Sequence, residues 1–278
     1  MVNDILKKVY QISLILFIIM ELFALKLPLI KKGDPLLNII ISVLDEQGKS
    51  LKEGDIVVIA EKVVATSQGR VVSLSDVKKI SLDAKKLSEL YDMDERYVEL
   101  IMRESSMIIG GMTHVILAKV NDFLIANAGI DQSNAGPNKV VLLPSNLKKI
   151  VWEYRDSLKK KYNLKDLGLI IADSRVQPLR KGTIGIAIAT AGFEPIEDLI
   201  GHPDLFNRPM EITTRAIADD LASAAQFLLS EADQRTPVVI IRNSNIEFTE
   251  NPVSTPEMEA EKCLYMNIFS KYLQSLEK

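Results

Sequence analysis

Two short apolar runs in this chain each lead into a carboxylate set among small polar residues. One run covers 123–130 and leads into Asp131, and the other covers 167–172 and leads into Asp173. Short runs rich in β-branched residues are typical of buried strands, and open α/β sheets bind ligands at the carboxyl ends of their strands. Hard cations such as Mg²⁺ are held by one or two carboxylates together with substrate phosphates. The pair therefore predicts a metal–phosphate site.

The rest of the chain alternates between strand-like and helix-like segments, which predicts a mixed α/β (α+β) fold. The Asn121-Asp122 pair predicts a tight hairpin, and Pro144-Ser145 predicts the cap of a helix that ends near Lys161. No internal repeat and no low-complexity linker is present in the sequence. Strands are predicted at 20–26, 56–60, 115–120, 123–130, 167–173, 184–191 and 238–241, and helices at 36–44, 81–105, 146–161, 214–230 and 256–277.

Composition limits the classes of function. With 278 residues the chain can form one large or two modest domains. Its formal net charge of −3 and the lack of a basic stripe argue against nucleic-acid binding. The single cysteine excludes an internal disulfide and fits a reducing compartment. Because the chain has only two histidines, a multi-histidine zinc site is not expected, and any metal should have oxygen ligands.

The amino terminus allows three interpretations. Residues 9–25 are apolar but are interrupted by Gln11, Ser13 and Glu21, and they are short for a span that needs about 20 apolar residues. No small-x-small cleavage site follows. Translation from Met20, with 1–19 as an extension, is the favoured interpretation. A packed extra helix and a membrane anchor are the alternatives, and a membrane association is not expected. Residues 20–278 are then expected to form one domain.

A third carboxylate, Glu231, ends the predicted 214–230 helix. If it met Asp131 and Asp173 without a cation, each pair about 4 Å apart would repel by about 4 kcal/mol at an effective dielectric constant near 20. Convergence of the three would thus imply a divalent cation. The alternative is that each aspartate only caps a turn or a helix.

Basic residues follow Asp173 closely, at Arg175, Arg180 and Lys181. Guanidinium groups bind carboxylates and phosphates with two hydrogen bonds, so this cluster is suited to an anionic substrate. A solvated loop is the alternative interpretation.

Several of these segments together resemble the coenzyme F-420-0:L-glutamate ligase family, the enzymes that build the glutamate tail of a deazaflavin coenzyme. The resemblance runs from about residue 27 to about residue 243. The most specific block is Asn-Ala-Gly-Ile-Asp-Gln-Ser-Asn at 127–134. Further matching blocks lie at 27–34, 54–58, 180–192 and 218–222.

The resemblance implies a cytoplasmic, GTP-dependent amide ligase that uses Mn²⁺ or Mg²⁺ and also K⁺. It further implies a homodimer with an intertwined, two-lobed mixed fold. Asp131 and Asp173 would bind one metal ion, Ser174 and Glu231 a second, and Arg180 would join Asp131 and Asp173 in the catalytic set. The positions that contact GTP would be Leu27, Pro28, Leu29, Ile30, Glu61, Lys62, Thr66, Asn134, Leu229, Ser230, Glu231, Ala232, Asp233, Gln234, Arg235 and Thr236.

In the implied reaction GTP phosphorylates a carboxylate of the coenzyme precursor, and the amino group of L-glutamate displaces phosphate to form an amide. The chain departs from the family pattern at a few places. Thr66 replaces a lysine, Ser230 and Ala232 replace glycines, and Asp173-Ser174-Arg175-Val176-Gln177 replaces Asp-Thr-x-Gly-Arg. Asn207 replaces a glycine but tolerates left-handed geometry. Two alternatives therefore stay open: a paralogue that acts on another carboxylate, and a nucleotide-binding module without turnover.

Overall fold

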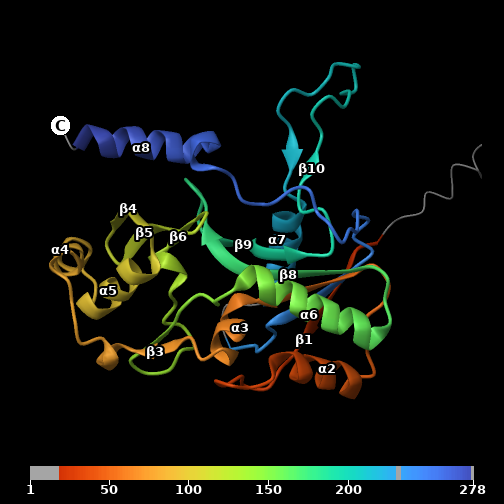
Figure 1. The fold of residues 1–278 in the computed structure, drawn as a ribbon, viewed down its shortest axis with the longest axis horizontal. Coiled ribbons are helices and arrows are strands. Elements are labelled where there is room, and N and C mark those ends of the chain that lie inside the picture. The colour runs from red at the N-terminus through yellow and green to blue at the C-terminus, as the bar shows by residue number, and fades with distance from the viewer. Residues whose placement is uncertain (1–18, 230–232, 277–278) are drawn as a thin grey trace, which may run out of the picture.

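A computed structural model describes residues 19–229 and 233–276 and is built around a five-stranded sheet (Figure 1). The strand order is β1-β12-β2-β8-β9, and only the β2–β8 pair is parallel. The mixed α+β class predicted from the sequence is thus confirmed. The strands are β1 (Glu21–Leu25), β12 (Val238–Arg242), β2 (Asp55–Ala60), β8 (Leu167–Val176) and β9 (Thr183–Ala191).

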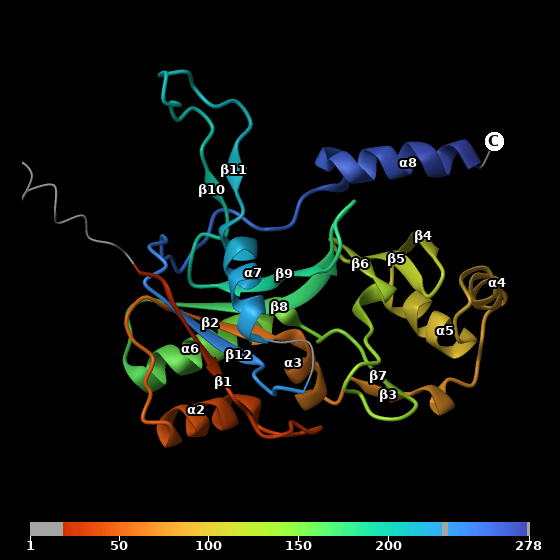
Figure 2. The same cartoon turned by 180° about the vertical axis from the view of Figure 1, so that it is seen from behind.

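Helices cover both faces of this sheet, and the alternation within β2 shows why. Val57 and Ile59 belong to the larger buried cluster, which includes residues of α2 (Leu36–Glu46) and α6 (Leu147–Tyr162). Ile56 and Val58 belong to a second cluster with α7 (Ile217–Leu229). Because successive residues of a strand point to opposite faces, an unbroken apolar strand needs cover on both sides. Figure 2 shows α7 on one face and α2 and α6 on the other.

A smaller α/β unit lies beside the sheet. It consists of the antiparallel strands β4 (Met107–Met112), β5 (Val115–Val120) and β6 (Phe123–Ala126), packed with α4 (Leu82–Tyr91) and α5 (Glu95–Glu104). The predicted hairpin at Asn121-Asp122 joins β5 to β6. The larger buried cluster extends into this unit through residues such as Val98 and Ile116. Short elements connect the two parts: α3 (Glu61–Ser67), β3 (Val71–Ser73), the 3-10 turn Leu74–Asp76, and β7 (Lys139–Val141), which pairs with β3.

Two segments project from this body (Figures 1 and 2). The first is an arm whose base is formed by β10 (Glu197–Asp198) and β11 (Thr214–Arg215). The second is α8 (Leu264–Leu276), which follows a 3-10 turn at Ala260–Lys262. Within the described part of the chain, none of the helices combines the length and the apolar character that a bilayer crossing requires.

The 81–105 segment forms two helices and not the single helix that the periodicity suggested. Asp92 adopts a left-handed conformation with φ 52° and ends α4. Two residues later the Asp94 side chain accepts the Arg96 N–H and begins α5. The left-handed Asp92 and the side-chain cap at Asp94 thus separate two amphipathic helices whose apolar residues follow the same helical spacing.

Three other predicted boundaries were wrong, two of them because of pairing with distant segments. The cap of α6 is Asn146 (φ 55°), since the Ser145 N–H donates to Gln68 Oε1 (2.9 Å). The α7 helix begins at Ile217, because residues 214–215 pair with 197–198 as β11. The C-terminal helix begins at Leu264 rather than at 256.

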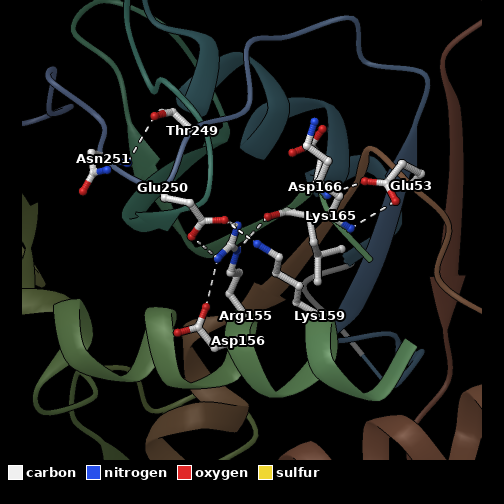
Figure 3. A network of polar contacts seen from close by, with 10 residues as sticks. Glu53, Arg155, Asp156, Lys159, Lys165, Asp166, Thr249, Glu250 and Asn251 are labelled. Atoms are coloured by element: carbon white, nitrogen blue, oxygen red, sulfur yellow. Dashed lines mark hydrogen bonds and ion pairs between the residues drawn. The ribbon is translucent and has the colours of Figure 1, made fainter. Parts of the chain in front are cut away.

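The chain beyond β12 is attached to α6 by a network of ion pairs (Figure 3). Arg155 is 2% exposed and donates from its two terminal nitrogens to Glu250, at 2.6 Å each. Lys159 also donates to Glu250, and Arg155 Nε donates to the Leu167 carbonyl (3.0 Å). Nearby, the Glu53 carboxylate accepts the backbone N–H groups of 165–166. Through Arg155 and Lys159, this network fixes the C-terminal segment to α6 and to the beginning of β8.

The expectation for 1–19 falls almost entirely outside the described residues. The strand predicted at 20–26 is confirmed by β1, which pairs with β12. The assignment of 20–278 to one domain and the intertwined homodimer stay predictions.

Candidate functional site

Two cavities share one polar wall. The first, of about 530 Å³, lies beside the C-terminal half of α7, and we call it the α7-side cavity. The second, of about 610 Å³, lies beside the β5–β6 unit, and we call it the hairpin-side cavity. The residues common to both linings are Glu61, Asp131, Asp173 and Ser174. Both predicted metal-binding aspartates thus come together at the boundary between two spaces large enough for small molecules.

Asp131 reaches this wall because the preceding residues form a left-handed turn. Strand β6 ends at Ala126, earlier than the predicted 123–130 strand, and Asn127, Ala128 and Gly129 follow with φ values of 51°, 56° and 69°. Asn and Gly adopt this region readily, whereas Ala does so at a cost. The Asn127 side chain stabilises the turn by accepting the Ile116 N–H (2.9 Å).

Gly129 is required at this turn for a second reason. A Cβ on Gly129 would lie 2.6 Å from the Leu143 side chain. Two residues later, Asp131 exchanges backbone hydrogen bonds with Val141 (3.0 and 2.8 Å). The turn and this bridge together fix the position of the Asp131 carboxylate.

Asp173 lies within a strand and not at its end, which corrects the sequence prediction. Strand β8 continues to Val176, because Asp173 and Ser174 pair with Ile186 and Gly185 of β9. The loop expected after Asp173 therefore starts three residues later. Asp173 still faces both cavities, and its Oδ1 accepts the Ser174 N–H (2.6 Å).

A lysine and a serine surround the Asp131 carboxylate. Lys62 Nζ donates to Asp131 Oδ2 and to Ser133 Oγ (3.0 Å), and Ser133 donates to Asp131 from its backbone N–H (2.6 Å) and its hydroxyl (2.7 Å). Burial raises the pKa of Asp131, but the hydrogen bonds and the charge of Lys62 outweigh it and hold this pKa below its ordinary value. The carboxylate is therefore ionised at neutral pH.

Tyr97 lies against the other side of Asp131, in the hairpin-side cavity. Its hydroxyl donates to the Ile130 carbonyl (2.6 Å), and the residue is 5% exposed. Burial, together with the negative charge of Asp131, raises the pKa of Tyr97 well above its usual range. Tyr97 is thus a neutral hydrogen-bond donor that supports the backbone before Asp131.

The α7-side cavity collects most of the positions that the family resemblance assigned to GTP. Its rim is held by backbone hydrogen bonds from Leu27 to Arg235 (2.9 Å) and from Ala60 to Pro237 (2.9 Å). These bonds bring the segments 28–30 and 233–237 to one opening. The predicted residues in its lining are Pro28, Leu29, Ile30, Glu61, Lys62, Asp131, Asn134, Asp173, Ser174, Leu229, Asp233, Arg235 and Thr236.

The remaining predicted residues lie elsewhere. Leu27 is buried in the core, and Gln234 and Arg180 are exposed and line neither cavity. Thr66 lies one turn after Lys62 on α3, and its hydroxyl donates to the Lys62 carbonyl (2.7 Å). Thr66 is also absent from the linings of both cavities. Ser230, Glu231 and Ala232 fall outside the described residues.

The shared wall suits a hard divalent cation by the chemistry of its donors. Two aspartates, one glutamate and a serine hydroxyl are oxygen ligands of the kind that Mg²⁺ and Mn²⁺ take. Within 19–229 and 233–276, however, no three His, Cys, Asp or Glu side chains are grouped closely enough to hold a metal ion. Glu231, the predicted ligand of the second metal, lies outside those ranges.

Sequence analysis did not single out some residues of the site. Gln226 of α7 lines the α7-side cavity, and Tyr97 lines the hairpin-side cavity. Ser133 follows Asp131 by two residues, a spacing at which an aspartate accepts a backbone N–H, and this was a usable signal. The positions of Gln226 and Tyr97 depend on packing between distant elements and have no local signature.

Two departures from the family pattern have a structural explanation. Val176 continues strand β8, so this position does not need the positive φ of a glycine. Asn207 adopts φ 60°, which confirms that asparagine replaces glycine in a left-handed conformation there.

Comparison with known proteins gives a consistent result. The family model described as F420-0:Gamma-glutamyl ligase matches residues 24–243. The chain is similar to the "Coenzyme F420:L-glutamate ligase" of Methanothermobacter thermautotrophicus, with 38% identity over 78% of this chain and 85% of the relative. The proteins of the same name from Methanopyrus kandleri and Methanocaldococcus jannaschii are each 36% identical. They cover 77% and 82% of this chain, and 82% and 89% of their own lengths.

Proposed function

This chain belongs to the F420-0:Gamma-glutamyl ligase family, and on that basis we propose that it adds L-glutamate to the deazaflavin coenzyme precursor F420-0 with the help of GTP and a divalent metal ion. The observation that carries the proposal is the pair of cavities joined by Glu61, Asp131, Asp173 and Ser174. A ligase of this kind needs two substrates that meet at one phosphate group, and this arrangement offers two spaces with one common wall.

We assign GTP to the α7-side cavity. Most of the positions expected to contact the nucleotide line it, and Lys62 brings a positive charge to its boundary. An ammonium group in this place favours the negative charge of phosphates. The hairpin-side cavity then receives the carboxylate acceptor from the opposite side of the shared wall.

The proposed reaction has two steps. A carboxylate oxygen of the acceptor attacks the γ-phosphorus of GTP, the bond to the β-phosphate oxygen breaks, and an acyl phosphate and GDP form. The amino group of L-glutamate then attacks the acyl carbon, phosphate leaves, and the amide remains. Asp131, Asp173 and Ser174 would hold the divalent ion, which would supply positive charge to neutralise the transferring phosphoryl group.

The direct test incubates the chain with GTP, MnCl₂, L-glutamate and F420-0 and analyses the products by mass spectrometry. The proposal predicts a mass gain of one or more glutamyl residues together with release of phosphate. Phosphate release only with other carboxylic acids would instead identify a paralogue with a different acceptor. Thermal stabilisation by GTP without turnover would identify a nucleotide-binding module. A parallel assay with ATP shows whether guanine is required.

The expected K⁺ requirement, the homodimer and the cytoplasmic location stay predictions. Titration of the ligase reaction with KCl, together with light scattering of the purified protein, tests the first two.

A further inference from the structure

The hairpin-side cavity has an unbalanced charge. Glu61, Asp131 and Asp173 lie on its shared wall, and Asp92 and Asp94 lie farther along its lining. Among the lining residues that the structure describes, Arg175 is the one arginine or lysine. Lys62 pairs with Asp131 and Arg96 pairs with Asp94, so Arg175 is the guanidinium group of this lining that a carboxylate entering the space can meet.

Arg175 is close to the reacting wall by the geometry of its strand. It follows Asp173 by two residues in β8 and pairs with Ile184 of β9. Residues two apart in a strand point to the same face, and both residues line the hairpin-side cavity. The strand thus presents a metal-binding carboxylate and a cation side by side.

A third cavity, of about 160 Å³, is also lined by Arg175, and we call it the tail cavity. Asp219 of α7 lines it and accepts the Ala187 N–H at 2.9 Å, which holds its carboxylate in place. Asp219 and Arg175 attract each other electrostatically. The opposite wall comes from the C-terminal segment, including Met258, Cys263 and Met266.

This C-terminal wall lies beyond the family match, which ends at residue 243. Arg175 is half-buried and lines both the hairpin-side cavity and the tail cavity. Arg180, by contrast, is exposed in the loop between β8 and β9 and lines none of the three cavities. Among the basic residues that follow Asp173, Arg175 is therefore the one placed to bind a substrate.

Resting on the proposed function, we propose that Arg175 binds the carboxylate of the acceptor in the hairpin-side cavity and determines specificity for an anionic acceptor. The planar guanidinium donates two parallel hydrogen bonds to that carboxylate. It offsets the repulsion from the acidic lining while the carboxylate approaches the γ-phosphate.

Steady-state kinetics with F420-0 as the varied substrate test this assignment. Arg175→Ala is expected to raise the KM for F420-0 about ten- to hundred-fold, the size of a lost hydrogen bond to a charged group, and to leave the KM for GTP unchanged. Arg175→Lys keeps the positive charge but not the two parallel N–H donors, so its KM for F420-0 should lie between those of the unmodified chain and Arg175→Ala. Arg208→Ala is the matched control, because Arg208 is an exposed arginine of the projecting arm and pairs with Asp204.

The outcomes separate this inference from the proposed function. If the unmodified chain does not convert F420-0, the proposed function fails and the assignment of Arg175 fails with it. If the unmodified chain converts F420-0 and Arg175→Ala has the same KM for F420-0 as Arg208→Ala, only the assignment of Arg175 is overturned. If the alanine variant does not fold, the KM for F420-0 of Arg175→Gln, which retains a polar side chain, provides the same test. A merely structural role would lower kcat or the melting temperature without a selective change in the KM for F420-0.

Discussion

Lys62 and Asp131 form an ion pair across the wall that the two cavities share. They are 69 residues apart in the chain, and Lys62 comes from α3 whereas Asp131 follows the left-handed turn after β6. The positive charge of Lys62 stabilises the ionised form of the Asp131 carboxylate, which is the form that binds a cation. Under the proposed function, Asp131 would hold a divalent ion, and Lys62 would supply a positive charge to the nucleotide phosphates.

The first prediction concerns Asp131→Asn. The amide cannot carry the negative charge that a divalent ion requires, so we expect turnover to be lost. The fold should persist, because the Lys62–Asp131 pair is partly exposed and such pairs contribute at most about 1 kcal/mol. Ligase assays and thermal melts measure the two effects separately. Asp83→Asn on the exposed start of α4 is the control, and activity of Asp131→Asn equal to this control would show that Asp131 is outside the metal site.

A second prediction concerns the metal ion itself. MnCl₂ should stabilise the unmodified chain, because a ligand that binds only the folded state at about 100 times its Kd adds about 2.7 kcal/mol to the free energy of unfolding. Asp173→Asn should abolish this stabilisation while the protein remains folded. Differential scanning calorimetry at several MnCl₂ concentrations provides the measurement, and equal Mn²⁺-dependent shifts in both proteins would contradict the assignment of Asp173.

The third prediction compares two glycines with positive φ. Gly136 has φ 90° and free space around its Cα, so Gly136→Ala should cost only the left-handed backbone term of about 1–2 kcal/mol. Gly129→Ala also forces a Cβ against Leu143 and should cost a further 1–3 kcal/mol or so. It should in addition reduce turnover, because the turn positions Asp131. Urea denaturation and ligase assays of both variants check this, and equal losses of stability would contradict the packing argument.

The fourth prediction is the pH dependence of the Arg155–Glu250 pair. The hydrogen bond from Arg155 holds the pKa of Glu250 at about 2, below its ordinary value of 4.5, although burial opposes this. Because the folded-state pKa is the lower one, the pair stabilises the fold fully above pH 4.5, and the contribution disappears as the pH falls toward 2. Half of the Glu250 side chain is solvent-exposed, so we expect only about 1 kcal/mol at pH 7.

Glu250→Gln tests the fourth prediction by urea denaturation at pH 7 and at pH 3. The difference in unfolding free energy between Glu250→Gln and the unmodified chain should be present at pH 7 and smaller at pH 3. Glu89→Gln on the exposed face of α4 serves as the control and should change neither value. A difference that stays constant with pH would assign the effect to hydrogen-bond geometry and not to charge.

Local sequence was sufficient for the elements whose signals lie within a few residues. In the Asn127-Ala128-Gly129 turn, Asn127 and Gly129 are residue types that tolerate positive φ, and the Asp131 that follows lies on the shared wall. The strands β2 and β12 have short β-branched runs, and these runs were sufficient to predict them.

Long-range pairing explains most of what the sequence could not show. The extension of β8 beyond Asp173 depends on β9, which supplies hydrogen-bond partners for Ser174–Val176. No local sequence pattern predicts this pairing. The same extension separates Arg175, which lines the hairpin-side cavity, from Arg180, which does not. Both arginines belong to one basic cluster in the sequence, so only the end of the strand distinguishes them.

The central claim, phosphoryl transfer from GTP to an acceptor carboxylate across the shared wall, has one direct measurement. F420-0 labelled with ¹⁸O in its carboxylate is incubated with the chain, GTP, MnCl₂ and L-glutamate, and the released phosphate is analysed by mass spectrometry. The proposed acyl phosphate places one labelled oxygen in each phosphate that accompanies amide formation. Amide formation with unlabelled phosphate, or phosphate release without any amide, would contradict the account.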